Sequence, residues 1–303
     1  MKDEKSVKVE NPAWQERLAL LFKQSMTVLL AVMSAAGVFI RTIQYMYFID
    51  SRTGFYQKGD ITHWILYILI AVFFLLLCAG AFLDRRRYTL SYTEERFSLL
   101  WKVSAVLAVA MVAQGVFDLF GQFFADPIPV LGLLRSILLI CSGAAFGMQA
   151  FKFKNQKVDG KNLDILYIFP IIWAAFRLGE YFLENTMVVN VSENLFAILY
   201  LAFVLIFLLT SCKIYARLDS QKTIRYMLVS GAMTVVCGFM RTIPKYVLFL
   251  FMGERKEQPP LIDLVLSLYA LILVFALLQS RTPLEETEEV LSVPEADAGQ
   301  ADE

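Results

Sequence analysis

The chain is poor in charged residues, which make up 18% of its 303 positions. Soluble domains carry about 25% charged and about 45–50% apolar residues, whereas 58% of this chain is hydrophobic. Lysine plus arginine equal aspartate plus glutamate at 28 each, so the chain lacks the basic excess typical of nucleic-acid binding. This composition predicts an integral membrane protein and no nucleic-acid partner.

Histidine and paired cysteine, the usual ligands of transition metals, are scarce. His63 is the single histidine and stands beside Trp64 at the start of an apolar stretch, where we expect an interfacial position. The four cysteines are far apart and none has CxxC spacing: Cys78, Cys141, Cys212 and Cys237. Isolated cysteines of this kind behave as small apolar residues. We therefore predict no metal site and no cofactor.

Signatures of enzymes and of nucleotide-driven pumps are also missing. The chain has no HExxH motif, no P-loop and no GxGxxG motif, and His63 has no obvious companion for nucleophilic catalysis. An aspartyl protease needs two aspartates within the membrane, and only Asp118 is expected to lie deep enough. An acid–base mechanism using Asp118 and Glu180 stays open. Catalysis is thus the least favoured class, and active transport would need ion coupling or a separate ATPase.

Eight apolar stretches are long enough to cross a bilayer, which takes about 20 mostly apolar residues in a helix. They are 26–48, 64–83, 99–120, 130–151, 165–183, 195–212, 227–251 and 261–279. In the fourth stretch, Gly143 and Gly147 form a GxxxG pattern, which predicts close packing against another helix of the same chain, with contact between two copies as the less favoured alternative. We expect an all-α polytopic integral membrane protein with about eight transmembrane helices and no extramembrane domain.

The loops alternate in positive charge. Lysine and arginine gather in the N-terminal tail and in the loops after the second, fourth and sixth stretches, while the other loops carry few or none. Loops rich in lysine and arginine stay cytoplasmic. Residues 1–15 are polar and no signal-peptide cleavage site follows. We therefore expect both termini in the cytoplasm and the protein in a bacterial plasma membrane.

Polar segments suggest a division of the chain. Residues 1–25 are expected to form a cytoplasmic tail and an interfacial helix that starts near Asn11-Pro12. Residues 26–151 and 165–280 would be two parallel four-helix halves joined by the cytoplasmic loop 152–164, a plan found in some transporters. Residues 281–303 form an acidic tail that is expected to be disordered. The repeat rests on a weak echo. The first, third, fifth and seventh stretches carry polar residues in their outer halves, and Arg177 and Tyr181 repeat the four-residue spacing of Arg41 and Tyr45.

Charged and tyrosine side chains recur toward the outer ends of these helices. A charge at the centre of a spanning helix costs about 2.5–3.5 kcal/mol on insertion scales, so such residues usually face protein or water. The predicted ligand-binding set is Arg41, Tyr45, Asp118, Arg135, Arg177, Glu180, Arg241 and Lys245. If these side chains converge, they form a cationic cavity open to the outside; otherwise they snorkel separately. Pro244 is expected to kink its helix and free the carbonyl of Met240.

Two functions fit such a set equally well. Arginine recognises carboxylate and phosphate through two parallel hydrogen bonds, so the chain could be a carrier or receptor for an anionic small molecule or for the phosphate of a membrane lipid. Alternatively, the charges form ion pairs that set helix register, with the chain as a structural or partner subunit of a membrane-protein assembly. The expected pairs are Arg177 with Glu180, and Asp118 with Arg41, Arg135 or Arg241.

Overall fold

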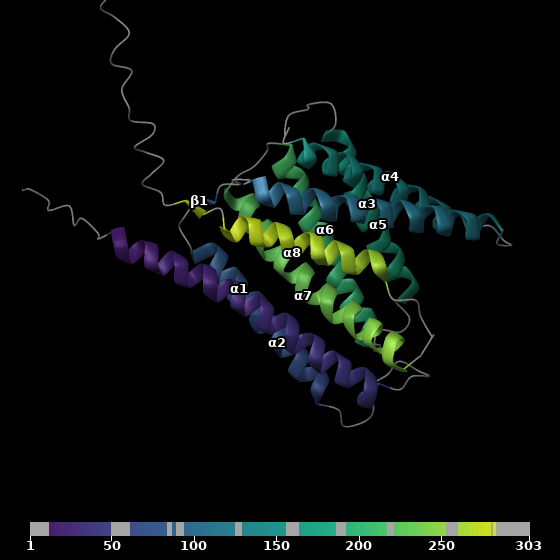
Figure 1. Cartoon of the computed structure of the whole chain (residues 1–303). Coiled ribbons are helices and arrows are strands. Elements are labelled where there is room, and N and C mark those ends of the chain that lie inside the picture. The colour runs from purple at the N-terminus through teal and green to yellow at the C-terminus, as the bar shows by residue number, and fades with distance from the viewer. Residues whose placement is uncertain are drawn as a thin grey trace, which may run out of the picture.

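The fold is a bundle of helices, described for residues 12–49, 61–83, 87–88, 94–124, 129–155, 164–185, 192–216, 221–252, 260–279 and 281–282 of a computed structural model (Figure 1). The long helices are α1 Pro12–Ile43, α2 Thr62–Leu83, α3 Glu94–Phe123, α4 Val130–Lys154, α5 Ile168–Asn185, α6 Ser192–Tyr215, α7 Gln221–Met252 and α8 Leu261–Gln279. A π-helical turn, η1 Gln44–Phe48, extends α1, and a 3-10 turn, η2 Asp164–Tyr167, leads into α5. The strands β1 Arg87–Tyr88 and β2 Arg281–Thr282 have two residues each. The all-α prediction is confirmed.

Seven of these helices are long and apolar enough to cross a membrane. The exception within the described residues is α5, which has 18 residues and carries Arg177, Glu180 and Glu184. At 1.5 Å per residue it is about 27 Å long, slightly less than the roughly 30 Å of a hydrocarbon core. Among the eight predicted helices, α5 is therefore the one that is not long and apolar enough by itself, within the described residues, to be identified as a span.

The strand pair indicates that α5 nevertheless crosses. β1 follows α2 and β2 follows α8, and the two pair antiparallel, with Arg87 opposite Thr282. The end of α2 and the end of α8 therefore lie on the same side of the bundle. An even number of crossings must separate them, and the six helices from α3 to α8 satisfy this only when α5 is counted.

Helix α7 lies at the centre of the packing. It contacts α1, α2, α6 and α8, while α3 and α4 lie side by side and meet the rest through α8 and α5 (Figure 1). Some 78% of the spanning part of α7 is buried, against 28% for each of α1, α2 and α3. Two glycines permit close approach, since a Cβ on Gly37 would overlap Met240 and one on Gly238 would overlap Ser267. The central position of α7 explains how it keeps polar residues away from lipid.

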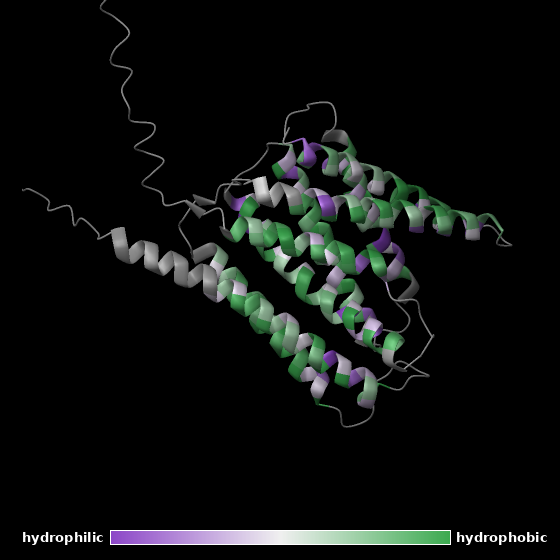
Figure 2. Ribbon diagram, in the orientation of Figure 1, coloured by the Kyte–Doolittle hydropathy of each residue, from purple (hydrophilic) through white to green (hydrophobic). Residues whose placement is uncertain are grey.

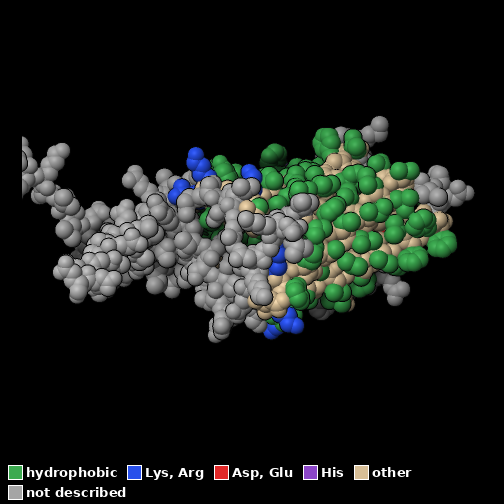
Figure 3. All heavy atoms as spheres, turned by 90° about the horizontal axis from the view of Figure 1, so that it is seen from above, with side chains coloured by type: hydrophobic (Ala, Val, Ile, Leu, Met, Phe, Trp, Pro, Cys, Tyr) green, Lys and Arg blue, Asp and Glu red, His purple; other side chains and the backbone are tan. Residues whose placement is uncertain are grey.

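The helices are apolar along most of their length (Figure 2). Figure 3 shows one face on which hydrophobic side chains predominate. Across the bundle, Val106, Val109 and Phe117 on α3 and Leu131 and Ile137 on α4 are among the exposed apolar side chains. Such a surface suits a lipid environment, where apolar exposure has no cost. The coarse class of multi-spanning membrane protein follows from this surface and from the seven apolar helices.

Several buried hydroxyl groups inside the bundle donate hydrogen bonds to their own helices. Ser142, Ser211, Thr234 and Thr242 each donate to the carbonyl four residues earlier, at 2.7–2.8 Å. This arrangement lets polar residues sit in the core without a partner from another helix. The predicted close packing at the GxxxG pattern also lies within the chain, because a Cβ on Gly143 would stand 3.0 Å from the carbonyl oxygen of Ala108 on α3.

One helix covers two segments that the sequence suggested as separate. α1 is continuous from Pro12 to Ile43, so the segment expected to lie at the interface and the first span belong to one helix. α7 continues through Pro244, which lies inside it, so the proline does not end the helix, and the expected kink there stays a prediction. The division into two four-helix halves stays a prediction, and the tails and loops named in it lie largely outside the described residues.

Candidate functional site

Asp263, in the first turn of α8, is a buried carboxylate that two arginines contact. Pro260 precedes the helix, and an acidic side chain in a first turn is stabilised by the positive end of the helix dipole. The Asp263 side chain is fully buried. The position lies at the end of α8 opposite β2, which the loop charges predict to be the outer side.

Two arginines from two other helices converge on this carboxylate. Arg177 of α5 donates from Nη1 to Oδ1 at 2.5 Å and from Nη2 to Oδ2 at 3.0 Å. Arg241 of α7 donates from Nη1 to Oδ2 at 2.9 Å. The bidentate geometry at Arg177 is the strong form of an arginine–carboxylate contact. The three residues, which we call the Arg–Asp–Arg centre, tie α5, α7 and α8 together.

Aromatic and hydroxyl side chains enclose the centre. The Tyr200 hydroxyl and the Ser267 Oγ both donate to the backbone carbonyl of Asp263, at 3.1 and 2.7 Å. The Arg241 guanidinium lies 5.8 Å from the ring centroid of Tyr200 and 5.9 Å from that of Tyr181, within cation–π range. These contacts hold the arginine in place and reduce its access to water.

The centre carries more positive than negative charge. Two guanidinium groups share one carboxylate, which leaves one positive charge in excess among the three residues. Lys245, one turn after Arg241 on α7, is close enough to add to the positive field at Asp263. The Arg241 side chain is only 10% exposed, and its buried Nε has no hydrogen-bond partner among the described residues. The centre could therefore accept a further anionic or acceptor group.

A second ion pair lies next to this centre on α5. Arg135 of α4 contacts Glu180 at 3.2 Å, with a second hydrogen bond of 3.3 Å. Glu180 thus pairs with Arg135, and the predicted pair of Arg177 with Glu180 is wrong. The reason is rotation about the helix: residues three apart on α5 point to α8 in one case and to α4 in the other.

Arg41 is fully buried but belongs to a different local cluster. It donates to Oε1 of Gln44 at 3.0 Å and to the Tyr45 hydroxyl at 3.5 Å. Its guanidinium lies 4.6 Å from the ring centroid of Phe196 on α6. Gln44 in turn donates to Thr62 at the start of α2, at 3.1 Å. Arg41 and Tyr45 therefore brace the π-helical turn η1 against α2 and α6.

Asp118 lies apart from the other predicted site residues. It sits on α3 and accepts a hydrogen bond of 2.8 Å from Gln114 of the same helix. The predicted pairing of Asp118 with Arg41, Arg135 or Arg241 is wrong, because Arg135 pairs with Glu180 and Arg241 with Asp263. The structure thus brings together Arg177 and Arg241, with Lys245 near them and the Arg135–Glu180 pair adjacent.

Asp263 is the residue that the sequence-based set missed. Asp263 lies within the predicted eighth stretch, but only two residues from its start. Because the predicted start of a helix is uncertain by several residues, Asp263 could be taken for a loop residue. The usable signal was an acidic residue shortly after Pro259-Pro260 in an otherwise apolar stretch. Its two partners are 86 and 22 residues away in the chain.

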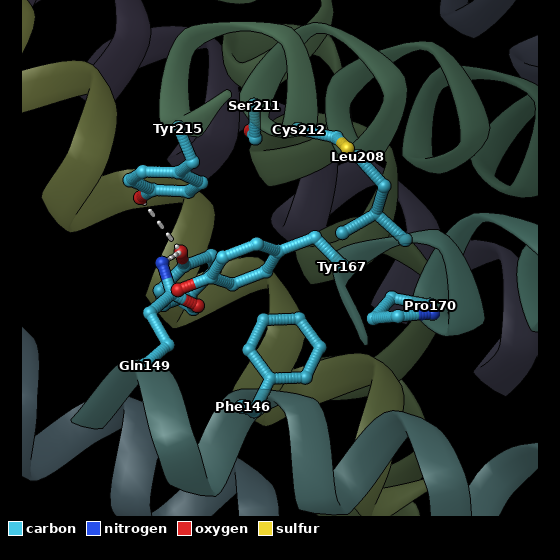
Figure 4. A pocket seen from close by; sticks show the side chains of 9 residues that line it. Phe146, Gln149, Tyr167, Pro170, Leu208, Ser211, Cys212 and Tyr215 are labelled. Atoms are coloured by element: carbon cyan, nitrogen blue, oxygen red, sulfur yellow. Dashed lines mark hydrogen bonds between the residues drawn. The ribbon is translucent and has the colours of Figure 1, made fainter. Parts of the chain in front are cut away.

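A small pocket of about 20 Å³, with room for about one water molecule, lies near the other ends of the helices. Figure 4 shows that rings from several helices line it, with Tyr167, Tyr215 and Gln149 turned toward one another. Gln149 donates to the Tyr269 hydroxyl at 2.6 Å, and that hydroxyl lies 3.1 Å from the hydroxyl of Tyr215. Tyr167 stacks on Tyr215 with ring centroids 5.3 Å apart. This cluster joins α4, α6 and α8 through satisfied polar groups and carries no charge of its own.

Metal ligands do not gather in the described part of the chain, where no group of three histidine, cysteine or carboxylate side chains is placed to hold an ion. Comparison with known proteins identifies no relative: no family model, no curated protein and no solved structure matches the chain. The function has to be argued from the side chains themselves.

Proposed function

We propose that this membrane protein is a carrier or receptor for a small anion with a carboxylate or phosphate group, bound in the outer half at the Arg–Asp–Arg centre. The observation that carries this proposal is the buried Nε of Arg241, which has no partner among the described residues, in a cluster with one excess positive charge.

Electrostatics favours an anionic ligand at this position. An uncompensated charge buried in a protein costs several kcal/mol, and an anion that contacts it removes this penalty. Arg241 uses one terminal nitrogen for Asp263, which leaves its Nε edge for a second acceptor. A carboxylate or a phosphate oxygen suits this edge, since guanidinium binds both with charge-assisted hydrogen bonds.

Access to the centre comes from the α5 side. The Arg177 side chain is 22% exposed although both of its terminal nitrogens contact Asp263. The ring of Tyr181 lies beside Arg241, and its hydroxyl donates to Asn194 of α6 at 3.0 Å. A ligand that reaches Arg241 would therefore pass Arg177 and Tyr181, which supply a positive charge and an apolar wall.

A structural role is the second candidate, because the centre joins three helices. Three hydrogen bonds from Arg177 and Arg241 to one carboxylate hold α5 and α7 against the start of α8. Under this alternative the chain is a partner subunit whose charges fix helix register. The two functions differ in what Arg241 does when no ligand is present.

The variant Arg241→Gln separates them. Loss of the Arg241 charge leaves Arg177 and Asp263 as a balanced pair. If the centre binds anions, the ligand-free variant therefore keeps the unfolding temperature of the wild type, while its stabilisation by anions disappears. Thermal unfolding of the purified protein in nanodiscs measures both, with sodium phosphate and sodium succinate compared against sodium chloride at equal ionic strength. Saturating ligand at 100 times Kd stabilises a protein by about 2.7 kcal/mol, which corresponds to a rise of roughly 5–11 °C.

The matched control is Arg135→Gln, which removes the same charge from the same half of the bundle but not from the centre. It should keep the response to anions. Nanodiscs with phosphatidic acid in place of phosphatidylcholine test a lipid phosphate, and uptake of labelled phosphate or succinate into proteoliposomes distinguishes a carrier from a receptor. If neither anion nor lipid stabilises the wild type and Arg241→Gln lowers the unfolding temperature, the centre is structural.

A further inference from the structure

A second unusual charge lies on the lipid-facing side of α3. Asp118 is partly exposed there, and Gln114, its hydrogen-bond donor, is exposed. Around them Val116, Phe117 and Phe120 are 38%, 70% and 63% exposed. Ionisable residues within spanning helices almost always face protein or water, so this carboxylate requires an explanation of its own.

Snorkelling of the Asp118 side chain toward the outer surface does not explain its position. Asp118 lies five residues before the end of α3 at Phe123, which is about 7.5 Å along the helix. Its carboxylate accepts a hydrogen bond of 2.8 Å from Gln114, one turn closer to the middle of the helix. The side chain is therefore drawn toward the centre of the bilayer, the opposite of the direction that would bring it to water.

The neighbouring helix does not cover this group either. α3 packs on α4 at Gly115, where a Cβ would lie 2.7 Å from Ile140, and at Gln122, which lies one turn after Asp118 and accepts a hydrogen bond from Ser136 at 3.2 Å. Asp118 lies at the edge of this contact, and its hydrogen-bond donor is Gln114 of its own helix. Among the described residues Asp118 makes no ion pair. Gly121 falls on the same face as Gln114 and Asp118, seven and three residues along, and a Cβ there would meet nothing within 4 Å.

We propose that the face of α3 formed by Gln114, Phe117, Asp118 and Gly121 docks a transmembrane helix of a partner protein that carries a lysine or arginine. Opposite charge at matching depth would neutralise Asp118, and Gln114 would offer a further polar contact within the membrane. The open space at Gly121 lets the partner's backbone come close. This docking face is independent of the Arg–Asp–Arg centre.

Charge selects this occupant over a second copy of the chain. A two-fold contact through the same face would bring Asp118 opposite its own equivalent, and like charges repel. On α4, the helix adjacent to α3, the arginine is Arg135, and it already pairs with Glu180. The chain therefore presents an acid on this face without presenting a matching base for it among the described residues.

The test uses the full-length protein with a photoreactive benzoylphenylalanine in place of Phe117, reconstituted in phosphatidylcholine vesicles. The probe is a synthetic polyleucine helix with a single arginine five residues from its outer end, and its control is the same helix with leucine there. We expect crosslinking to the arginine probe to exceed that to the leucine probe by roughly three- to thirtyfold, the range of measured interhelical hydrogen bonds in membranes.

Two variants assign the preference to the carboxylate. Asp118→Asn should remove the preference for arginine, and Asp118→Lys should transfer it to a probe with glutamate at that position. Equal crosslinking of arginine and leucine probes would overturn the proposal. So would crosslinks at twice the mass of the chain that persist in the presence of the arginine probe, because they would show that a second copy covers the face.

Discussion

Replacing Asp263 by asparagine should destabilise the protein more than replacing either of its arginine partners. The change removes the one carboxylate that Arg177 and Arg241 share and leaves two guanidinium groups without a counter-charge, whereas loss of one arginine leaves a balanced pair. An asparagine carbonyl can still accept one hydrogen bond, but its amide group would face a donor. Removing one partner of a buried ion pair costs about 3–5 kcal/mol, because the other charge stays buried.

This free energy converts into a measurable shift. For chains of 150–250 residues, unfolding temperatures move by about 2–4 °C per kcal/mol, so we expect a loss of roughly 6–20 °C. Thermal unfolding in nanodiscs can be followed by tryptophan fluorescence, because Trp173 is buried with its ring centroid 5.4 Å from the Arg177 guanidinium. The measurement should be made without added phosphate or carboxylate.

The matched control is Asp118→Asn, the same chemical change on the lipid-facing side of α3. Because Asp118 makes no ion pair among the described residues, its replacement should leave the unfolding temperature of the isolated protein nearly unchanged. The reasoning fails if the two substitutions shift the temperature alike. It also fails if Asp263→Asn is neutral, since the two arginines would then be neutralised by something other than this carboxylate.

Two further predictions concern packing and the polar cluster at the opposite ends of the helices. Gly238→Ala should cost about 1–3 kcal/mol through overpacking, since its Cβ would overlap Ser267. Gly121→Ala should leave the unfolding temperature unchanged or slightly higher, because nothing lies within 4 Å of its Cβ and alanine favours a helix over glycine; the unfolding temperatures compare the two variants directly. Tyr269→Phe should cost about 1–3 kcal/mol, because Gln149 loses the hydroxyl to which it donates at 2.6 Å. Tyr47→Phe, at a ring that is 68% exposed, is the control and should unfold like the wild type.

The proposals for the Arg–Asp–Arg centre and for the docking face of α3 make separate demands on the chain. The first requires one excess positive charge to be met by a ligand in the outer half, and the second requires one negative charge to be met by another protein. Arg241→Gln should abolish only the response to anions, and Asp118→Asn should abolish only the preference for a basic helix. A protein with both properties would be an anion-binding subunit that recruits a second membrane protein.

Much of the fold could be predicted because hydrophobic length is a local property. Each of the eight apolar stretches contains a helix, and several of these helices extend into the polar gaps beside their stretch. The fifth stretch differs from the others, since α5 carries three charged residues and is not among the seven helices identified as long and apolar enough to span. Helix ends were harder to place, and this uncertainty concealed Asp263 at the start of α8.

The site could be predicted only in part, because unusual residues can be recognised in the sequence and their partners cannot. Arg177 and Arg241 stood out as charges among apolar residues, and both contact the same carboxylate. The predicted pairs were wrong, because hydrophobicity says little about the rotation of a helix around its axis. Arg177 and Glu180 are three residues apart on α5, yet they face α8 and α4 respectively.

The sequence alone determined that this chain is a helical membrane protein and that its helices carry charges too costly to expose to lipid. Both conclusions depend on composition and on distance along the chain. Only the tertiary structure decided that Asp263 is shared by two arginines from different helices and that Asp118 faces outward. Those outcomes depend on the rotation and packing partners of each helix, which are set by close contacts such as those of Gly37 and Gly238 with their neighbours.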